Sequence, residues 1–357
     1  MTLKAAYIKK TFRFNFDART SRGEMKDKTS WFIKVWDQRH PDIMGIGECG
    51  PLPGLSIDDR PDFEKKLSAA LDQVKHFASK DIVTLPLHKI LPKGYPSIIF
   101  GLETALLDLA HGGRRMIFDN SFSKGLRIPI NGLIWMGDSE FMLRQIDEKI
   151  SKGFKCIKLK VGGIGFDLEC DLLGHVRERF SKNDITLRLD ANGAFSEDTV
   201  LEKLQVLSQF EIHSIEQPLM AGSAAMKEVC RRSPIPIAFD EELIGIEGRD
   251  NKVSMLDGLK PQFIVIKPSL HGGISGSKEW IQLAKDRNIG WWITSALESN
   301  IGLNAICQLA SNYPVTIPHG LGTGMIYEHN IPSPLRVDRG EIFLDKNTGW
   351  DVSLINE

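Results

Sequence analysis

Hydrophobic and polar residues alternate along the first 48 residues, and the pattern then changes to a helical spacing. Residues 7–16, 30–37 and 43–49 alternate with period two, which predicts three antiparallel strands. The polar segment 17–28 is predicted to be a loop between the first two strands. From about residue 58 to 115, apolar residues recur every three or four positions, which predicts two amphipathic helices. Residues 1–124 are therefore predicted to form one α+β unit.

A different rhythm begins near residue 127, where short apolar strands alternate with amphipathic helices. Eight such segments at near-regular spacing predict a (β/α)8-type barrel over residues 125–325. An open doubly wound sheet is the alternative, but no dinucleotide glycine signature follows the first strand. Residues 326–357 are predicted to return to the N-terminal unit. The eight predicted strands are 128–135, 156–161, 186–191, 212–217, 235–240, 263–268, 291–296 and 316–321.

Composition and charge narrow the classes of function. The net charge of −1 over 357 residues shows no basic excess that would favour a nucleic-acid partner. The sequence contains no run of about 18 apolar residues, so no membrane-spanning helix is predicted. The five cysteines are far apart and form no CxxC pair, so we expect neither a disulfide scaffold nor a zinc site. This use of cysteine fits a protein of the reducing cytoplasm. The sequence leaves the oligomeric state open.

Ionisable residues stand at the ends of five consecutive predicted strands, where the active site of such a barrel lies. Alternation places these residues on the inner face, opposite the aliphatic residues that face the helices. Glu241 has the opposite parity from its neighbour, so we expect it behind the site. The inward residues are Lys158 and Lys160, Asp190, Glu216, Asp240 and Lys267.

This set of residues predicts a metal-assisted proton abstraction. Three converging carboxylates need a cation among them, and oxygen ligands without His or Cys favour Mg²⁺, with Mn²⁺ as the alternative. Lysines on the strands before and after the acids would flank the metal, and a desolvated lysine near a cation can act as a general base. The expected partner is a small-molecule carboxylate, whose enediolate the metal would stabilise.

The same residues resemble the enolase superfamily in its muconate-lactonizing subgroup, whose lysine and Mg²⁺ chemistry is well known. The matching motifs are KLK at 158–160, LDAN at 189–192, EQP at 216–218, DE at 240–241 and KP at 267–268. The resemblance implies a (β/α)7β modified TIM barrel with an α+β capping domain. Within the subgroup the chain resembles the o-succinylbenzoate synthase family most, through the segments 47–56, 267–273, 294–303 and 318–324.

That resemblance implies a lyase of menaquinone biosynthesis that removes water in a syn-elimination from a succinyl-hydroxycyclohexadiene-carboxylate. It implies that Lys160 takes the proton and returns it to the departing hydroxyl, that Lys267 stabilises the enolate, and that Lys158 lowers the pKa of Lys160. The implied metal ligands are Asp190, Glu216 and Asp240, with Asn192 holding a water beside the metal and Glu241 behind them. The implied substrate contacts are Ser295, Gly320, Gly322, Arg19 in the polar loop, and Leu52 and Gly54 in the capping loop.

Other reactions use the same pair of lysines, so the resemblance leaves alternatives. Related barrels racemise N-acyl amino acids, epimerise dipeptides or cycloisomerise muconates. Dipeptide epimerases usually carry an Asp-x-Asp after strand seven, where this chain has SALESN (295–300), so the epimerase hypothesis is disfavoured. N-acylamino acid racemase activity stays open. A barrel that binds a ligand without catalysis is disfavoured, because both amines and all three acids stand at matching positions.

Overall fold

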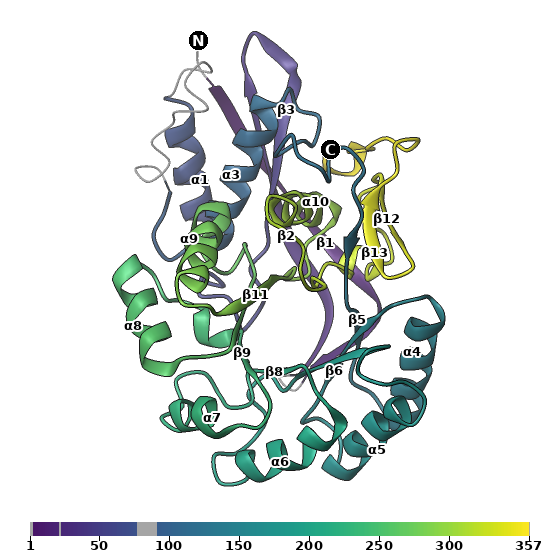
Figure 1. Ribbon diagram of the computed structural model, residues 1–357. Helices are drawn as coiled ribbons and strands as arrows, with labels where there is room; N and C mark the ends of the chain where they lie inside the picture. Colours follow the sequence, from purple (N-terminus) through teal and green to yellow (C-terminus); the bar gives the residue numbers. More distant parts are fainter. Residues whose placement is uncertain (1–2, 21–22, 77–90, 357) are drawn as a thin grey trace.

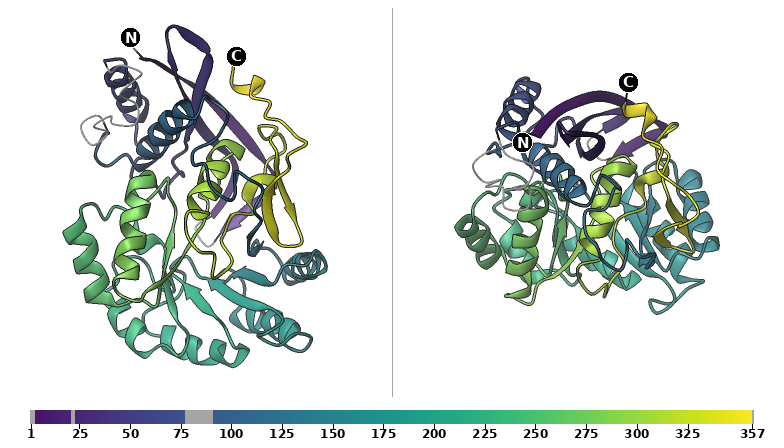
Figure 2. Two further views of the ribbon diagram at one scale, coloured as in Figure 1. Left: turned by 45° about the horizontal axis from the view of Figure 1, so that its top comes forward. Right: turned by 90° about the horizontal axis from the view of Figure 1, so that it is seen from above.

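The computed structural model describes residues 3–20, 23–76 and 91–356 of the chain. These residues form a three-stranded antiparallel sheet with two helices, a curved seven-stranded parallel sheet surrounded by helices, and a small third sheet (Figure 1). The antiparallel sheet and its two helices, which we call the cap, lie on one side of the barrel (Figure 2). Within the described residues, no helix is long and apolar enough to cross a lipid bilayer.

The described part of the cap consists of strands in the order β1-β2-β3 and of two helices that cover one face of that sheet. Alternation places Ile33 and Val35 on this face, where they pack with the apolar stripe of the second helix. That helix approaches closely because Gly47 has no side chain; a Cβ there would lie 1.9 Å from the carbonyl oxygen of Gly101. The elements are β1 (Leu3–Thr20), β2 (Gly23–Asp37), β3 (His40–Cys49), α1 (Phe63–Val74) and α3 (Pro96–Ala110).

The loop predicted over residues 17–28 is wrong. Strand β1 continues to Thr20 and β2 begins at Gly23, so most of the polar segment is extended. The first strand also reaches beyond its own sheet, since Phe14 forms an antiparallel bridge to Tyr327. Backbone pairing of this kind satisfies the peptide groups whatever the polarity of the side chains. A polar composition was therefore not enough to indicate a loop here.

The barrel sheet has the strand order β11-β10-β9-β8-β7-β6-β5, and every pair is parallel. Its two edges are joined by parallel bridges, one between His319 and Ile130 and one between Gly320 and Thr294. The predicted barrel is thus confirmed. The strands are β5 (Gly132–Ile134), β6 (Cys156–Lys160), β7 (Thr186–Asp190), β8 (Ser214–Glu216), β9 (Ile237–Phe239), β10 (Phe263–Ile266) and β11 (Gly290–Ile293).

Helices follow the barrel strands and cover their outer faces, as the amphipathic segments predict (Figure 1). Ile157 and Leu159 of β6, and Leu187 and Leu189 of β7, are buried in this layer. The helices are α4 (Ser139–Ser151), α5 (Phe166–Arg177), α6 (Val200–Leu207), α7 (Met226–Arg232), α8 (Arg249–Leu259), α9 (Gly273–Lys285) and α10 (Asn300–Ala310), with 3-10 turns η2 (Ser208–Phe210), η3 (Glu241–Leu243), η4 (Thr323–Met325) and η5 (Ser353–Ile355).

The first and last predicted barrel strands differ from the prediction. Segment 128–135 is split into β4 (Ile128–Pro129) and β5, and segment 316–321 contributes only its two bridges. Between β4 and β5 the chain changes its pairing partner, because Ile130 donates its N–H group to the Gly340 carbonyl and Asn131 donates to the His319 carbonyl. In segment 316–321, Pro318 has no N–H group for a continuous ladder. Strand β4 pairs instead with the C-terminal hairpin of β12 (Leu335–Asp338) and β13 (Glu341–Leu344).

The C-terminal segment also contacts the cap. Ile331 and Ile355 pack in one apolar cluster with Phe12 and Phe32 of the cap sheet. The segment therefore connects the first barrel strand with the cap, and lies beside both in Figure 1. The domain boundaries expected after residues 124 and 325 stay predictions.

Candidate active site

Lys158 and Lys160 lie inside the barrel, with only 8% of each residue exposed. They point inward because their neighbours Ile157 and Leu159 occupy the helix-facing side of the same strand. The parallel register places Lys160 directly beside Asp190 of β7. Two adjacent strands therefore bring a cation and an anion to the same level of the barrel.

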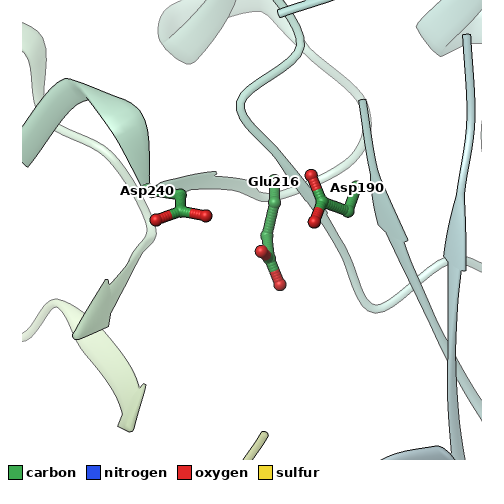
Figure 3. A group of neighbouring side chains, drawn as sticks. All are labelled: Asp190, Glu216 and Asp240. Carbon is green, nitrogen blue, oxygen red and sulfur yellow. The ribbon is translucent and has the colours of Figure 1, made fainter. Parts of the chain in front are cut away.

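Three carboxylates converge next to these lysines. Asp190 and Glu216 are register partners at the ends of β7 and β8, and Asp240 follows β9. One oxygen of each lies within 4.8 Å of the others, and all three residues are buried. Figure 3 shows the three carboxylates in a row, with Glu216 between the two aspartates. Asp190, Glu216 and Asp240 are called the acid trio below.

The acid trio fits a hard divalent cation. Oε1 of Glu216 and Oδ1 of Asp240 are buried without a hydrogen-bond partner. Unpaired carboxylate oxygens in an interior are costly unless a cation or a donor meets them. An all-oxygen set of this kind suits Mg²⁺ or Mn²⁺. Among the described residues, no other group of three potential ligands comes as close together.

Each lysine of the site contacts a member of the acid trio. Lys158 Nζ lies 2.5 Å from Glu216 Oε2 and 2.9 Å from Asp190 Oδ2. Lys160 Nζ lies 3.0 Å from Asp190 Oδ2, and Lys267 Nζ donates to Asp240 Oδ2. Lys160 and Lys267 therefore approach the trio through its two outer members. A substrate atom held over the trio would have an amine on each side.

The two lysines of β6 have pKa values shifted in opposite directions. Burial lowers the pKa of Lys160, and the positive charges of Lys158 and Lys267 lower it further against the opposing effect of Asp190. Burial also disfavours the charge of Lys158, but the surrounding acid trio outweighs this effect and raises its pKa. Lys160 is thus the amine that loses its proton more readily, which is what a general base requires.

Side chains behind the trio fix its geometry. Asn192 accepts a hydrogen bond of 2.6 Å from Lys160 Nζ and donates one of 3.0 Å to Glu241 Oε1. Gln217, which we did not single out from the sequence, has a left-handed φ of +39°. Its side-chain oxygen accepts the backbone N–H groups of Asp240 and Glu242. The EQP motif therefore supplies a residue that positions the next strand end, beside the expected ligand.

A cavity of about 410 Å³ opens above the lysines. Lys158, Lys160 and Lys267 line its floor together with Asp190 and Asn192. Its upper wall includes Phe16, Met25, Leu52 and Leu55 of the cap, and Trp135 and Leu297 of the barrel. The cavity therefore joins a charged floor to an apolar wall.

Among the predicted substrate contacts on the barrel, Ser295, Gly320 and Gly322 line the cavity. The hydroxyl of Ser295 lies 2.5 Å from that of Thr323, which also lines the cavity and was not predicted. Gly320 is required by packing, since a Cβ there would lie 2.2 Å from Thr294 Oγ1. This side of the cavity offers two hydroxyl groups for a polar part of a ligand.

The predicted contacts from the cap are placed differently. Leu52 lines the cavity, but Gly54 is exposed, is not among the lining residues and donates its N–H group to Asp59 Oδ2. Leu55 lines the cavity as well. It is the second apolar residue of the segment PLPGLS (51–56) that could have been proposed as a contact on the same ground as Leu52. The backbone of Arg19 pairs with Glu24 in the hairpin, whereas its side chain lies outside the described part of the chain.

Comparison with known protein families agrees with this geometry. Residues 142–357 match the model of the enolase C-terminal domain-like family. The o-succinylbenzoate synthase of Desulfotalea psychrophila is 42% identical over 95% of this chain and 98% of its own length. The o-succinylbenzoate synthase of Bacillus subtilis is 27% identical over 71% of this chain.

Solved structures give the same result. The crystal structure of MenC from Desulfotalea psychrophila superposes with a TM-score of 0.84 at 38% identity, covering 96% of this chain and 100% of that one. The L-Ala-D/L-Glu epimerase of Bacillus subtilis has a TM-score of 0.83 at 17% identity, so it shares the fold. The predicted modified TIM barrel with a capping domain is confirmed. This chain belongs to the o-succinylbenzoate synthase family of the enolase superfamily.

Proposed function

We propose that this chain removes water from a succinyl-hydroxycyclohexadiene-carboxylate to form o-succinylbenzoate. The observation that carries the proposal is the placement of Lys160 and Lys267, which contact the two outer members of the acid trio in the floor of one cavity. That arrangement suits abstraction of a proton next to a carboxylate, followed by loss of a neighbouring hydroxyl. The apolar wall above suits the ring of such a substrate.

The proton transfers follow from the placement of the lysines. Neutral Lys160 takes the proton from the carbon next to the substrate carboxylate, and the electrons of that C–H bond spread into the carboxylate. Lys267 stays charged and stabilises the negative charge that develops. Lys160 then gives its proton to the departing hydroxyl; the C–O bond breaks, water leaves, and the electrons return to make the ring aromatic. One lysine serves both steps because the elimination is syn.

The metal belongs to the same proposal. Asp190, Glu216 and Asp240 would hold Mg²⁺, and Mn²⁺ is the alternative. When bound, the ion supplies positive charge that stabilises the developing charge on the substrate carboxylate. Lys158 donates to Glu216 and Asp190, and it thereby fixes two of the ligands. A small-molecule carboxylate is the proposed partner, and the five unpaired cysteines favour a reducing, cytoplasmic setting.

Racemase and epimerase activities are the competing reactions on this fold. Epimerases that act on dipeptides need an anionic group for the peptide amine, and the corresponding loop here presents Leu297, Glu298 and Ser299. Glu298 is fully buried, and its oxygens are occupied by Ser269 Oγ and Ala296 N. It is therefore not available to a substrate amine in the cavity. The loop favours the dehydration over dipeptide epimerisation.

An ultraviolet assay for o-succinylbenzoate formation tests the proposal, run beside a racemisation assay with an N-succinyl amino acid. We expect Mg²⁺-dependent product formation at a higher kcat/KM than racemisation. In Lys160→Met, kcat should fall by roughly 10²- to 10⁴-fold, since a general base contributes about that much. Lys155→Met is the matched control, because Lys155 is exposed and immediately precedes the same strand.

Two results would contradict the proposal. Faster racemisation than dehydration in the wild-type protein would assign the site to the alternative reaction. Near-normal dehydration by Lys160→Met would remove Lys160 from the role of base. Exchange of substrate hydrogen with deuterated water separates the two failures, because it reports proton abstraction even where water is not lost.

A further inference from the structure

Leu297 occupies an unusual backbone conformation in the wall of the active-site cavity. Its φ of +62° lies in the left-handed region, where a bulky side chain is strained. The residue lines the cavity and packs against the apolar cluster that contains Leu52 of the cap. A strained residue in such a place is held by its surroundings, and the holding groups can be identified.

Two buried donors hold the backbone of Leu297. Its carbonyl oxygen accepts a hydrogen bond of 3.0 Å from Lys28 Nζ and another from the hydroxyl group of Tyr327. Lys28 comes from β2 of the cap and is 1% exposed, and Tyr327 is 5% exposed. A charged side chain thus crosses from the cap to fix one peptide group of the barrel.

The charge of Lys28 is matched by the residue next to Leu297. Glu298 is fully buried, and the positive charge of Lys28 counteracts the rise in its pKa that burial causes. The Glu298 carboxylate also accepts hydrogen bonds of 2.5 Å from Ser269 Oγ and 2.6 Å from Ala296 N. Lys28 therefore places a positive charge near the buried carboxylate in the loop that carries Leu297.

The neighbouring residues leave room for this arrangement and add a second attachment. A Cβ at Gly50 would lie 2.7 Å from Lys28 Nζ, so the glycine keeps the path of Lys28 open. Glu48, two residues earlier, accepts the N–H groups of Ser299 and Gly302, each at 2.9 Å. The start of the cap loop (residues 50–58) and the barrel loop that follows β11 are thus tied together next to Leu297.

We propose that Lys28 is a positioning residue that holds the Leu297 side chain against Leu52 and so forms the apolar wall over the substrate ring. The inference rests on the proposed dehydration for its substrate. Lys28 does not line the cavity and contacts neither Lys160 nor the acid trio in any hydrogen bond or ion pair between described residues. Its loss should therefore weaken substrate binding and leave the proton transfers intact.

Lys28→Met removes the ammonium group and keeps a long side chain. Lys34→Met is a matched control, because Lys34 is also buried, points to the same face of β2 and donates to Asn356 Oδ1. For Lys28→Met we expect KM to rise by roughly tenfold or more, as for loss of a hydrogen bond to a charged group, with kcat within about threefold of wild type. For Lys34→Met we expect both constants near wild type. Tyr327→Phe, a milder change at the same carbonyl, should raise KM in the same direction.

Backbone hydrogen exchange without substrate gives a second readout that does not depend on the reaction. Lys28→Met should speed exchange at residues 296–302 and 51–56, and Lys34→Met should not. An unchanged KM in Lys28→Met, or exchange rates equal to wild type in both segments, would overturn the inference. A larger fall in kcat than rise in KM would overturn it too. If wild-type protein forms no o-succinylbenzoate, the proposed function fails, whereas the exchange comparison still decides whether Lys28 holds the loop.

Discussion

Asp58, at the end of the cap loop, provides a test of the energetics of the cap. The residue is fully buried, and its Oδ2 accepts the backbone N–H and the hydroxyl group of Ser97 at 2.8 and 2.6 Å. Its Oδ1 has no hydrogen-bond partner. Burial raises the pKa of Asp58 to about 6, although Ser97 and the charge of Arg60 favour the ionised form. We predict that Asp58→Asn stabilises the protein at neutral pH.

The sign and size follow from proton linkage. The carboxyl group binds its proton more tightly in the folded protein than in the unfolded chain, so its ionisation reduces stability as the pH rises from about 4 to about 6. A shift from 3.8 to about 6 corresponds to a penalty of about 3 kcal/mol above pH 7. Because part of the penalty is already present at pH 5, the change between pH 5 and pH 8 is about 1.4 kcal/mol. Asparagine keeps an acceptor for Ser97 and carries no charge, so it lacks this change.

The assay is urea unfolding at pH 5 and pH 8, without added metal. The difference in unfolding free energy between Asp58→Asn and wild type should grow by about 1.4 kcal/mol from pH 5 to pH 8. Asp59→Asn, at the neighbouring exposed carboxylate, controls for the loss of a charge in the same loop. A difference that is the same at both pH values would refute the reasoning, and so would a difference that shrinks as the pH rises.

Two further predictions concern the metal site. Asp190→Asn should weaken Mg²⁺ binding measured by calorimetry, because it removes a charged ligand from the acid trio; an unchanged affinity would contradict the ligand assignment. Gln217→Leu should lower Mg²⁺ affinity by roughly 10- to 100-fold, the usual effect of losing a residue that orients a ligand. The reason is that the side-chain oxygen of Gln217 accepts the backbone N–H groups of Asp240 and Glu242. An affinity equal to wild type in Gln217→Leu would contradict the prediction, because it would mean that Asp240 keeps its position without these hydrogen bonds.

The charged floor of the site could be predicted because the rules involved are local. Period-two alternation decides which residues of β6 and β7 face inward, and parallel strands bring their carboxyl ends to one rim. These two rules were enough to predict that Lys158, Lys160 and Asp190 lie side by side in the barrel. Gln217 needed more, because its role depends on a left-handed backbone and on amides that come from the following strand.

The cap could be predicted as a fold, and one of its predicted substrate contacts, Leu52, lines the cavity. Alternation indicated its strands, yet it failed at residues 17–28, where backbone pairing overrides a polar composition. Gly54, which was predicted as a contact together with Leu52, does not line the cavity, because the orientation of a loop residue depends on its anchors, here Asp59 and Ser97, rather than on a periodic pattern. Contacts between segments far apart in the sequence leave no periodic signal.

The division between floor and wall has a consequence for specificity. The lysines and the acid trio are held by barrel strands and by one another, so the chemistry of proton abstraction depends little on the cap. The apolar wall is shared between the cap loop and Leu297, whose backbone is held from outside by Lys28 and Tyr327. A change in the cap contacts of this chain should therefore alter substrate preference without moving its pair of lysines. Substitutions in the wall should change KM and substrate preference, whereas substitutions in the floor should change kcat for every substrate.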